Sequence, residues 1–229
     1  MILLTTEKKR MCDMTSEQCI SMSRITVTKG KRLILNDISW CIPFGKSTMV
    51  VGGIGSGRKE LFELFAGYDN HNSGRIKKNG KHAVVTEHFP MLRGFSVKDY
   101  LTISLAEEII EDSLIRIKAV LEKYDLWEKR EFEVEYLSLE ERCYLQLAMA
   151  DVQCPDVVLL EQCWRYLPMM PQNKFLKCIK QRIQEENITF VLFVDNRDKE
   201  LENYFEEVVR IEHGVILTIK EENRYVGLE

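Results

Sequence analysis

The chain of 229 residues has no long hydrophobic run. Its longest apolar stretches, such as FVLFV at 190–194, are much shorter than the ~18 apolar residues that a membrane-spanning helix needs. The first 19 residues also lack the apolar centre of a secretory signal peptide. We therefore expect no direct insertion into a membrane and a cytoplasmic location.

The chain also has no excess of positive charge. Lys and Arg number 32 and Asp and Glu number 36, so the net charge is -4. A nucleic-acid-binding domain usually carries a basic surface, and we expect no nucleic-acid partner here. With 45% hydrophobic and 30% charged residues, the composition is that of an ordinary globular protein. The length permits one α/β domain with a helical insertion or two small domains, and we favour one domain.

The seven cysteines are odd in number and include no C-x-x-C pair. This argues against a disulfide framework and against a cysteine metal site. Several of the cysteines fall in apolar segments, so buried free thiols are the expected state, and we expect no metal site.

A glycine-rich stretch, MVVGGIGSGRKELFELFAG at 49–67, is the most informative part of the chain. An apolar, β-rich run breaks into Gly52, Gly53, Gly55 and Gly57 and then into a pattern with helical period. Glycines let backbone N–H groups curl around an anion at a positive helix N-terminus. We predict a phosphate-binding loop whose candidate nucleotide contacts are Gly52, Gly53, Gly55, Ser56, Gly57, Arg58, Lys59 and Glu60.

This loop differs from the P-loop pattern G-x-x-x-x-G-K-S/T at its two chemical positions. Counted from Gly52, Arg58 falls at the Lys and Lys59 at the hydroxyl residue that binds Mg²⁺. Basic residues at a helix start oppose the helix dipole, which favours a retained anion such as phosphate or diphosphate. The alternative is that both are solvated surface residues.

A second glycine motif, GKST at 45–48, spells the end of a P-loop. Trp40 stands five residues before Gly45, where the pattern needs Gly, and the segment continues into an apolar strand instead of a helix. We interpret it as a turn that enters the strand.

Apolar periodicity predicts the order of the elements. A polar segment covers residues 1–18, and one domain covers residues 19–229. Two strands that flank a turn at 29–31 are predicted to form a small antiparallel layer. Farther along the chain, Ser96 can cap a helical block, with Asp99 as its capping-box partner. The predicted strands are 20–27, 32–42, 47–52, short strands within 73–87, 157–161, 189–195 and a pair within 208–219; a helix follows the glycine loop, and the other predicted helices are two or three within 97–129, 137–150, 173–186 and 199–205.

The segments follow one another in the order of one class of P-loop nucleoside triphosphatase (NTPase). After the loop come Glu87 with PMLRGFSVKDYL, then YLSLEERCYLQLAMA, PDVVLLEQCWRYLP, TFVLFVDN and RIEHGVI. Over residues 20–220 this order resembles the nucleotide-binding domain of the ATP-binding cassette (ABC) family. The resemblance implies an α/β P-loop NTPase fold with an ABC ATPase-like core, an antiparallel β-subdomain and a helical insertion at about 97–150.

The resemblance also assigns positions. LSLEE matches the LSGGQ signature, VVLLEQ matches the Walker B strand with its acidic pair, and Asp195 falls at the switch His. The GSGRKEL loop is similar to GAGRTEL of the second cassette of ribose- and galactose-type sugar importers, where an Arg in the P-loop is normal. Glu87 and Arg165 fit the same subgroup, although Glu87 could equally be a surface strand end. The signature-like residues are Ser138, Leu139, Glu140 and Glu141.

Departures from the family decide the expected chemistry. Gln162 replaces the general-base Glu, so a contribution of about 10²–10⁴-fold to the rate is missing. Lys59 cannot coordinate a metal, and we expect no Mg²⁺ binding. Glu161 replaces the Walker B Asp, and Glu161 and Gln162 could now be ordinary strand-end residues. Leu139 and Glu140 replace the signature glycines, and with Glu141 they bring bulk and negative charge where a phosphate should approach.

The sequence therefore favours a degenerate, non-hydrolytic cassette that binds ATP or ADP weakly, if at all. It would act as a binding or regulatory partner of a membrane permease or of an intact cassette protein, at the inner face of the membrane. The alternative is the ATP-binding, energy-coupling subunit of a carbohydrate importer. A third hypothesis is a sensor cassette detached from transport.

Overall fold

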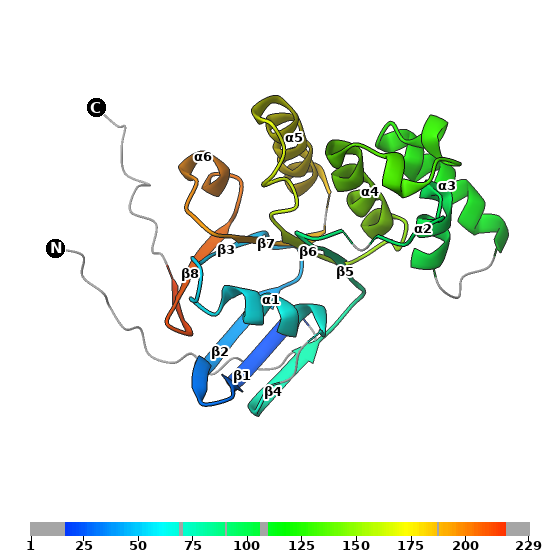
Figure 1. Ribbon diagram of the computed structural model, residues 1–229. Coiled ribbons are helices and arrows are strands. Elements are labelled where there is room, and N and C mark those ends of the chain that lie inside the picture. Colours follow the sequence, from blue (N-terminus) through cyan, green and yellow to red (C-terminus); the bar gives the residue numbers. More distant parts are fainter. Residues whose placement is uncertain (1–16, 69–70, 90, 106–109, 187, 219–229) are drawn as a thin grey trace.

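The computed structural model describes residues 17–68, 71–89, 91–105, 110–186 and 188–218. Most of the predicted polar segment 1–18, as well as Cys12, lies outside these residues. Two sheets and a set of helices make up the described part (Figure 1). Among its helices, none combines the length and apolar character needed to cross a bilayer.

The first sheet is the predicted antiparallel layer. Its strands are β1 (Gln18–Lys29), β2 (Arg32–Pro43) and β4 (Ser73–Lys78), in the order β2-β1-β4. The turn between β1 and β2 contains Gly30, whose φ of 64° suits glycine. The segment around Gly80 does not form a hairpin; it carries the chain from β4 in this sheet to β5 in the other.

The second sheet has six strands in the order β5-β6-β7-β3-β8-β9. All neighbouring pairs are parallel except β8 and β9, which pair antiparallel. Parallel strands that are covered on both faces are apolar along most of their length. The segments TMVV and TFVLFV fit this pattern, and all of their residues are buried. The strands are β3 (Thr48–Val51), β5 (His82–Val85), β6 (Val157–Glu161), β7 (Thr189–Val194), β8 (Glu207–Glu212) and β9 (Val215–Thr218).

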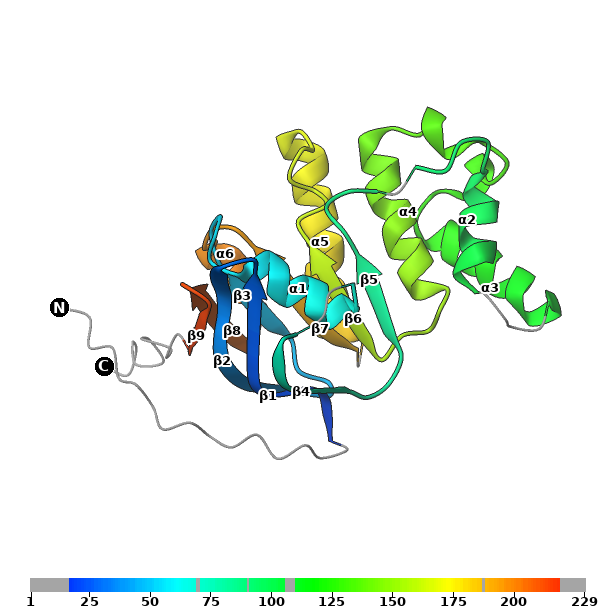
Figure 2. The ribbon, with the colours of Figure 1, turned by 60° about the horizontal axis from the view of Figure 1, so that its bottom comes forward.

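Helix α1 (Arg58–Ala66) lies between the two sheets, as Figures 1 and 2 show from two sides. Its apolar side chains are buried, and the Phe62 and Phe65 rings meet Phe193 of β7 edge-on, with centroids 5.2 and 5.9 Å apart. The Trp40 ring of β2 stacks on Phe65 from the other sheet. These contacts fix the position of the helix and therefore of the loop before it.

The other helices cover the opposite face of the six-stranded sheet or group beside β5 (Figure 1). Ser96 caps α2 with Asp99 as its capping-box partner, which confirms that prediction. Helix α5 begins four residues earlier than predicted, directly after Pro168, and α6 is only four residues long. The elements are α2 (Val97–Ser104), α3 (Ile110–Lys123), 3-10 turns at Trp127–Lys129 and Val134–Tyr136, α4 (Leu139–Asp151), α5 (Met169–Glu185) and α6 (Lys199–Glu202).

A buried ionic network joins α3, α4 and α5. The Arg182 guanidinium bonds Asp151 and Glu186, and Lys123 lies 2.9 Å from both carboxylates. Tyr124 donates its hydroxyl to Asp151 at 2.7 Å. Burial disfavours the charged guanidinium, but the surrounding acidic groups outweigh it and raise the pKa of Arg182 above its usual range. The network holds the helical group against α5.

We predict that Arg182→Met lowers the free energy of unfolding by about 2 kcal/mol, because Asp151 and Glu186 lose a buried guanidinium while Lys123 still pairs with both. Lys177→Met removes the same charge from an exposed position of the same helix and should change it by less than about 0.5 kcal/mol. Urea unfolding of the two variants provides the comparison. Equal effects would show that the network contributes no specific stability.

Candidate nucleotide-binding site

The predicted phosphate-binding loop lies between β3 and α1, at the carboxyl end of the parallel strands. Gly55 and Gly57 adopt positive φ angles of 77° and 98°, which side-chain-bearing residues rarely adopt. GKST at 45–48 is a turn that enters β3, as predicted, and Gly45 there has a φ of 73°. The strand, loop and helix arrangement is the one that the sequence predicts.

The glycines of the loop serve two different purposes. A Cβ atom on Gly52 would lie 2.5 Å from Ile211 Cγ2, and one on Gly57 would lie 2.7 Å from Leu35 Cδ2, so both positions are closed by packing. A Cβ atom on Gly53 would meet nothing within 4 Å, and one on Gly55 would approach only an Arg32 nitrogen, at 3.6 Å. Gly53 and Gly55 therefore leave open space above the loop.

Hydrogen bonds hold the loop in place. Gly52 donates its N–H to the Val194 carbonyl at 3.0 Å, and the Ser56 carbonyl accepts from the Gly214 N–H at 2.9 Å. Ser56 is buried, and its Oγ accepts the Arg58 N–H at 3.3 Å. Within the described residues, no acceptor is found for the N–H groups of Gly55 and Lys59. A preformed loop with free N–H groups is suited to an anion.

Charged side chains gather where β5, β6 and β7 end, beside the start of α1. The Arg58 guanidinium forms an ion pair with Asp195, and Arg165 forms ion pairs with Asp195 and, at 3.2 Å, with Glu87. The charges thus alternate along the row Arg58, Asp195, Arg165 and Glu87. Burial lowers the pKa of Arg58, and the nearby Glu161 carboxylate opposes that shift.

The Walker B positions are held by hydrogen bonds within the protein. Glu161 Oε2 accepts the Glu87 N–H at 3.2 Å, and Gln162 Oε1 accepts the Asp195 N–H at 3.1 Å. Burial raises the pKa of Glu161. Burial opposes ionisation of Glu87 as well, but hydrogen bonds from Tyr166 and Arg165 keep the pKa of Glu87 below its usual value.

Lys59 and Glu60 point away from this charge cluster. Lys59 Nζ lies 3.9 Å from Glu63 one helical turn on, and its side chain is 71% exposed. Glu60 pairs with Lys29 of β1 at 3.6 Å. The structure therefore directs Lys59 toward solvent and Glu60 toward the antiparallel sheet.

Most of the positions around the loop that could supply Mg²⁺ ligands are substituted or engaged, and Glu161 keeps a carboxylate that accepts the Glu87 N–H. The position of the metal-binding hydroxyl carries Lys59, whose ammonium group cannot be a ligand. The carboxylates of Asp195 and Glu87 are engaged by arginines. In the described part of the chain, no group of three or more His, Cys, Asp or Glu side chains could hold a metal ion.

The signature-like residues form the start of α4. Ser138 caps the helix with Glu141 as its capping-box partner, and Glu141 also pairs with Lys129. Glu140 lies 3.8 Å from Lys174, and Leu139 is half-exposed. The charge of Glu141 is therefore compensated within the chain, which the sequence analysis did not foresee.

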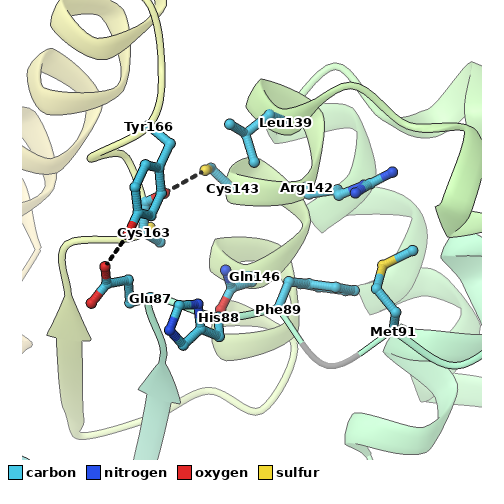
Figure 3. A pocket seen from close by; sticks show the side chains of 10 residues that line it. All are labelled: Glu87, His88, Phe89, Met91, Leu139, Arg142, Cys143, Gln146, Cys163 and Tyr166. Atoms are coloured by element: carbon cyan, nitrogen blue, oxygen red, sulfur yellow. Dashed lines mark hydrogen bonds between the residues drawn. The ribbon is translucent and has the colours of Figure 1, made fainter.

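A cavity of about 230 Å³ connects the Glu87 segment with α4 (Figure 3). Leu139 of the signature-like segment and Glu87 both line it, so the structure brings these two predicted positions to one cavity. Tyr166 also lines it and donates its hydroxyl to Glu87 at 3.0 Å. Tyr166 was not among the predicted site residues, although the family resemblance assigned a position to its neighbour Arg165.

The cysteines follow the prediction only in part. The six in the described residues are free, and Cys19, Cys143 and Cys163 are buried. Cys154 is exposed, so the expectation of burial is wrong there. Cys143 Sγ donates to the Cys163 carbonyl at 3.2 Å beside the cavity.

Comparison with known proteins agrees with this geometry. In alignments 214 residues long that cover 86% of the chain, it is 27% identical to the sulfate/thiosulfate import ATP-binding protein CysA of Yersinia pestis and 26% identical to CysA of Escherichia coli. The chain spans only 59% and 58% of the lengths of these relatives. Their names specify sulfate and thiosulfate, so the narrower resemblance to sugar importers stays a prediction.

Solved structures share the fold at low sequence identity. A nucleotide-free ATP-binding cassette from an ABC transporter superposes with a TM-score of 0.74 at 17% identity, covering 87% of this chain and 89% of that one. The cbiO1 protein of Clostridium perfringens, part of the ABC transporter complex cbiONQ, gives 0.73 at 19% identity, covering 88% and 87%.

The description of the ABC transporter family matches residues 35–164, more than half of the chain. This stretch runs from β2 through the loop and α4 to the segment after β6. The chain therefore belongs to the ABC transporter family, as an ATP-binding cassette domain with the α/β P-loop fold and an antiparallel β-subdomain.

Proposed function

We propose that this cassette binds nucleotide weakly without hydrolysing it, and acts as a binding or regulatory partner of a membrane permease or of an intact cassette. The observation that carries the proposal is the state of Gln162. An amide stands where the family has a general-base carboxylate, and its oxygen accepts the Asp195 N–H. An amide oxygen cannot take a proton from an attacking water.

Two further features support the proposal. Lys59 at the metal-ligand position lies 3.9 Å from Glu63 on α1, and its ammonium group cannot be a metal ligand. Phosphoryl transfer depends on metal and positioned charges for most of its acceleration. Nucleotide binding itself is supported by the open space above Gly53 and Gly55.

The alternative function is an ATP-binding, energy-coupling subunit of an importer, in which an intact partner supplies the working site. The relatives named as sulfate/thiosulfate import proteins favour a transport role, and the GSGRKEL loop favours a carbohydrate. Either role would place the chain in the cytoplasm, at the inner face of the membrane through a permease. Copurification of a permease with an intact cassette would favour this alternative.

We predict that the purified chain shows no ATP hydrolysis above the buffer rate, because Gln162 and Lys59 supply neither base nor metal ligand. Phosphate release in the presence of Mg²⁺ is the measurement. Arg58→Ala is the control, since it removes the cation of the loop. A Mg²⁺-dependent turnover that disappears in this variant would contradict the proposal.

Nucleotide binding should be weak and should tolerate chelation of metal. Calorimetric titration with ADP, with and without a chelator, tests this. Because Lys59 points away from the loop, we expect the chelation tolerance to persist in Lys59→Ala. Strictly Mg²⁺-dependent binding would show that the site holds a metal after all.

Two glycine variants separate binding from folding. Gly53→Ala puts a methyl group into the open space above the loop, and should weaken ADP binding with little change in unfolding free energy. Gly57→Ala forces a Cβ against Leu35 at a φ of 98°, and should lower stability. Calorimetry and urea unfolding are read together. A Gly53→Ala variant with unchanged ADP affinity would place the nucleotide elsewhere.

We also predict that ATP does not induce a homodimer. Leu139 brings a half-exposed side chain and Glu140 a carboxylate to the face that clasps phosphate in the family. Glu141 pairs closely with Lys129, whereas Glu140 has only the exposed Lys174 at 3.8 Å, so we assign the repulsion chiefly to Glu140. Light scattering with excess ATP checks this. A shift from monomer to dimer would favour the importer-subunit alternative.

A further inference from the structure

We propose that Arg58 and Arg165 form a two-arginine subsite for the terminal phosphoryl group of a nucleotide, and that Asp195 occupies this subsite in the free chain. This inference rests on the proposed function, because it explains why nucleotide binding is weak. It assigns ligand binding to Arg165 and the role of internal competitor to Asp195.

Two arginines converge on one carboxylate. Arg58 begins α1, Arg165 follows β6, and Asp195 follows β7. Both guanidinium groups form ion pairs with Asp195, one on each carboxylate oxygen. Two guanidinium groups repel one another unless an anion lies between them. The arrangement is therefore an anion site with an anion of the protein in it.

Asp195 is held in this position by the fold. Its side chain is 9% exposed, and its N–H donates to Gln162 Oε1 at 3.1 Å. The preceding residue, Val194, accepts the N–H of Gly52 from the loop itself. The fold therefore keeps the Asp195 carboxylate beside the phosphate-binding loop, where it competes with any anion that binds there.

The proposed subsite is open to solvent, and its geometry suits a phosphoryl group. Arg165 is 37% exposed, and the loop is open above Gly53, so an anion can approach both from solvent. A phosphoryl group carries three acceptor oxygens and suits bidentate bonds from two arginines better than a carboxylate does. A phosphoryl group at this position must displace Asp195 or lie against its negative charge.

The test is Asp195→Asn, which keeps the size of the side chain and removes its charge. Calorimetric titration with pyrophosphate and ADP, at low ionic strength and without metal, should show affinities about tenfold higher than in the unsubstituted chain, since the arginines lose their internal anion. Unchanged or weaker binding by the folded variant would overturn the proposal.

Asp198→Asn is the matched control. It removes one negative charge three residues away, and Asn preserves the cap that Asp198 provides for α6. We expect less than a twofold change in this variant. A gain equal to that of Asp195→Asn would show that net charge alone is responsible, and would overturn the proposal.

Arg165→Gln in the Asp195→Asn background tests the second arginine. The gain in pyrophosphate affinity should be lost, and persistence of the gain would remove Arg165 from the subsite. If Asp195→Asn does not fold, carbon NMR of the unsubstituted chain decides. Saturation with pyrophosphate should shift the Asp195 carboxyl signal, and an unshifted signal would overturn the proposal.

These measurements are independent of hydrolysis. Mg²⁺-dependent turnover by the unsubstituted chain would refute the proposed function, but leave the comparison between Asp195→Asn and Asp198→Asn intact. Conversely, unchanged pyrophosphate binding in Asp195→Asn would refute the subsite while the chain remained a non-hydrolytic cassette.

Discussion

The packing of α1 between two sheets is the constraint on which the rest of the structure depends. Phe62 and Phe65 meet Phe193 of the parallel sheet, and Trp40 of the antiparallel sheet stacks on Phe65. A helix held on both sides cannot shift along its axis without losing these contacts. The loop before the helix is therefore fixed in position as well. The start of the helix is so tightly packed that a Cβ atom on Gly57 would lie 2.7 Å from Leu35 Cδ2.

The same packing explains why two glycines of the loop are needed whether or not a nucleotide binds. Gly52 and Gly57 are required by the core whether or not a nucleotide binds, because a Cβ at either position would collide with packed atoms. Only Gly53 and Gly55 leave open space, and their freedom has no packing reason in the structure. A retained cradle beside substituted catalytic positions is the physical basis for the non-hydrolytic cassette that we propose.

Charge at the carboxyl edge of the sheet is balanced within the chain. Arg58, Asp195, Arg165 and Glu87 alternate in sign, and each carboxylate has a guanidinium partner. Such a row is stable without a ligand, since no buried charge is left uncompensated. In the subsite that we propose, a polyanion must replace Asp195 as the partner of Arg58 and Arg165. Its affinity then depends on the difference between these two sets of ion pairs more than on the number of contacts that it makes.

The sequence by itself determined the strand, loop and helix order, the antiparallel layer and the Ser96 capping box, because these depend on local periodicity and on residue types at short spacing, whereas the ABC fold was implied by the resemblance of the ordered motifs to that family. It also located the loop glycines, but could not tell which of them face the core and which face open space. Only the tertiary structure decided the direction of Lys59, the compensation of Glu141 by Lys129, the exposure of Cys154 and the meeting of Arg58 with Asp195. Those features depend on side chains from distant segments, or on which face of an element is covered, and the physical reason is that packing and charge pairing are fixed only when the sheets and helices assemble.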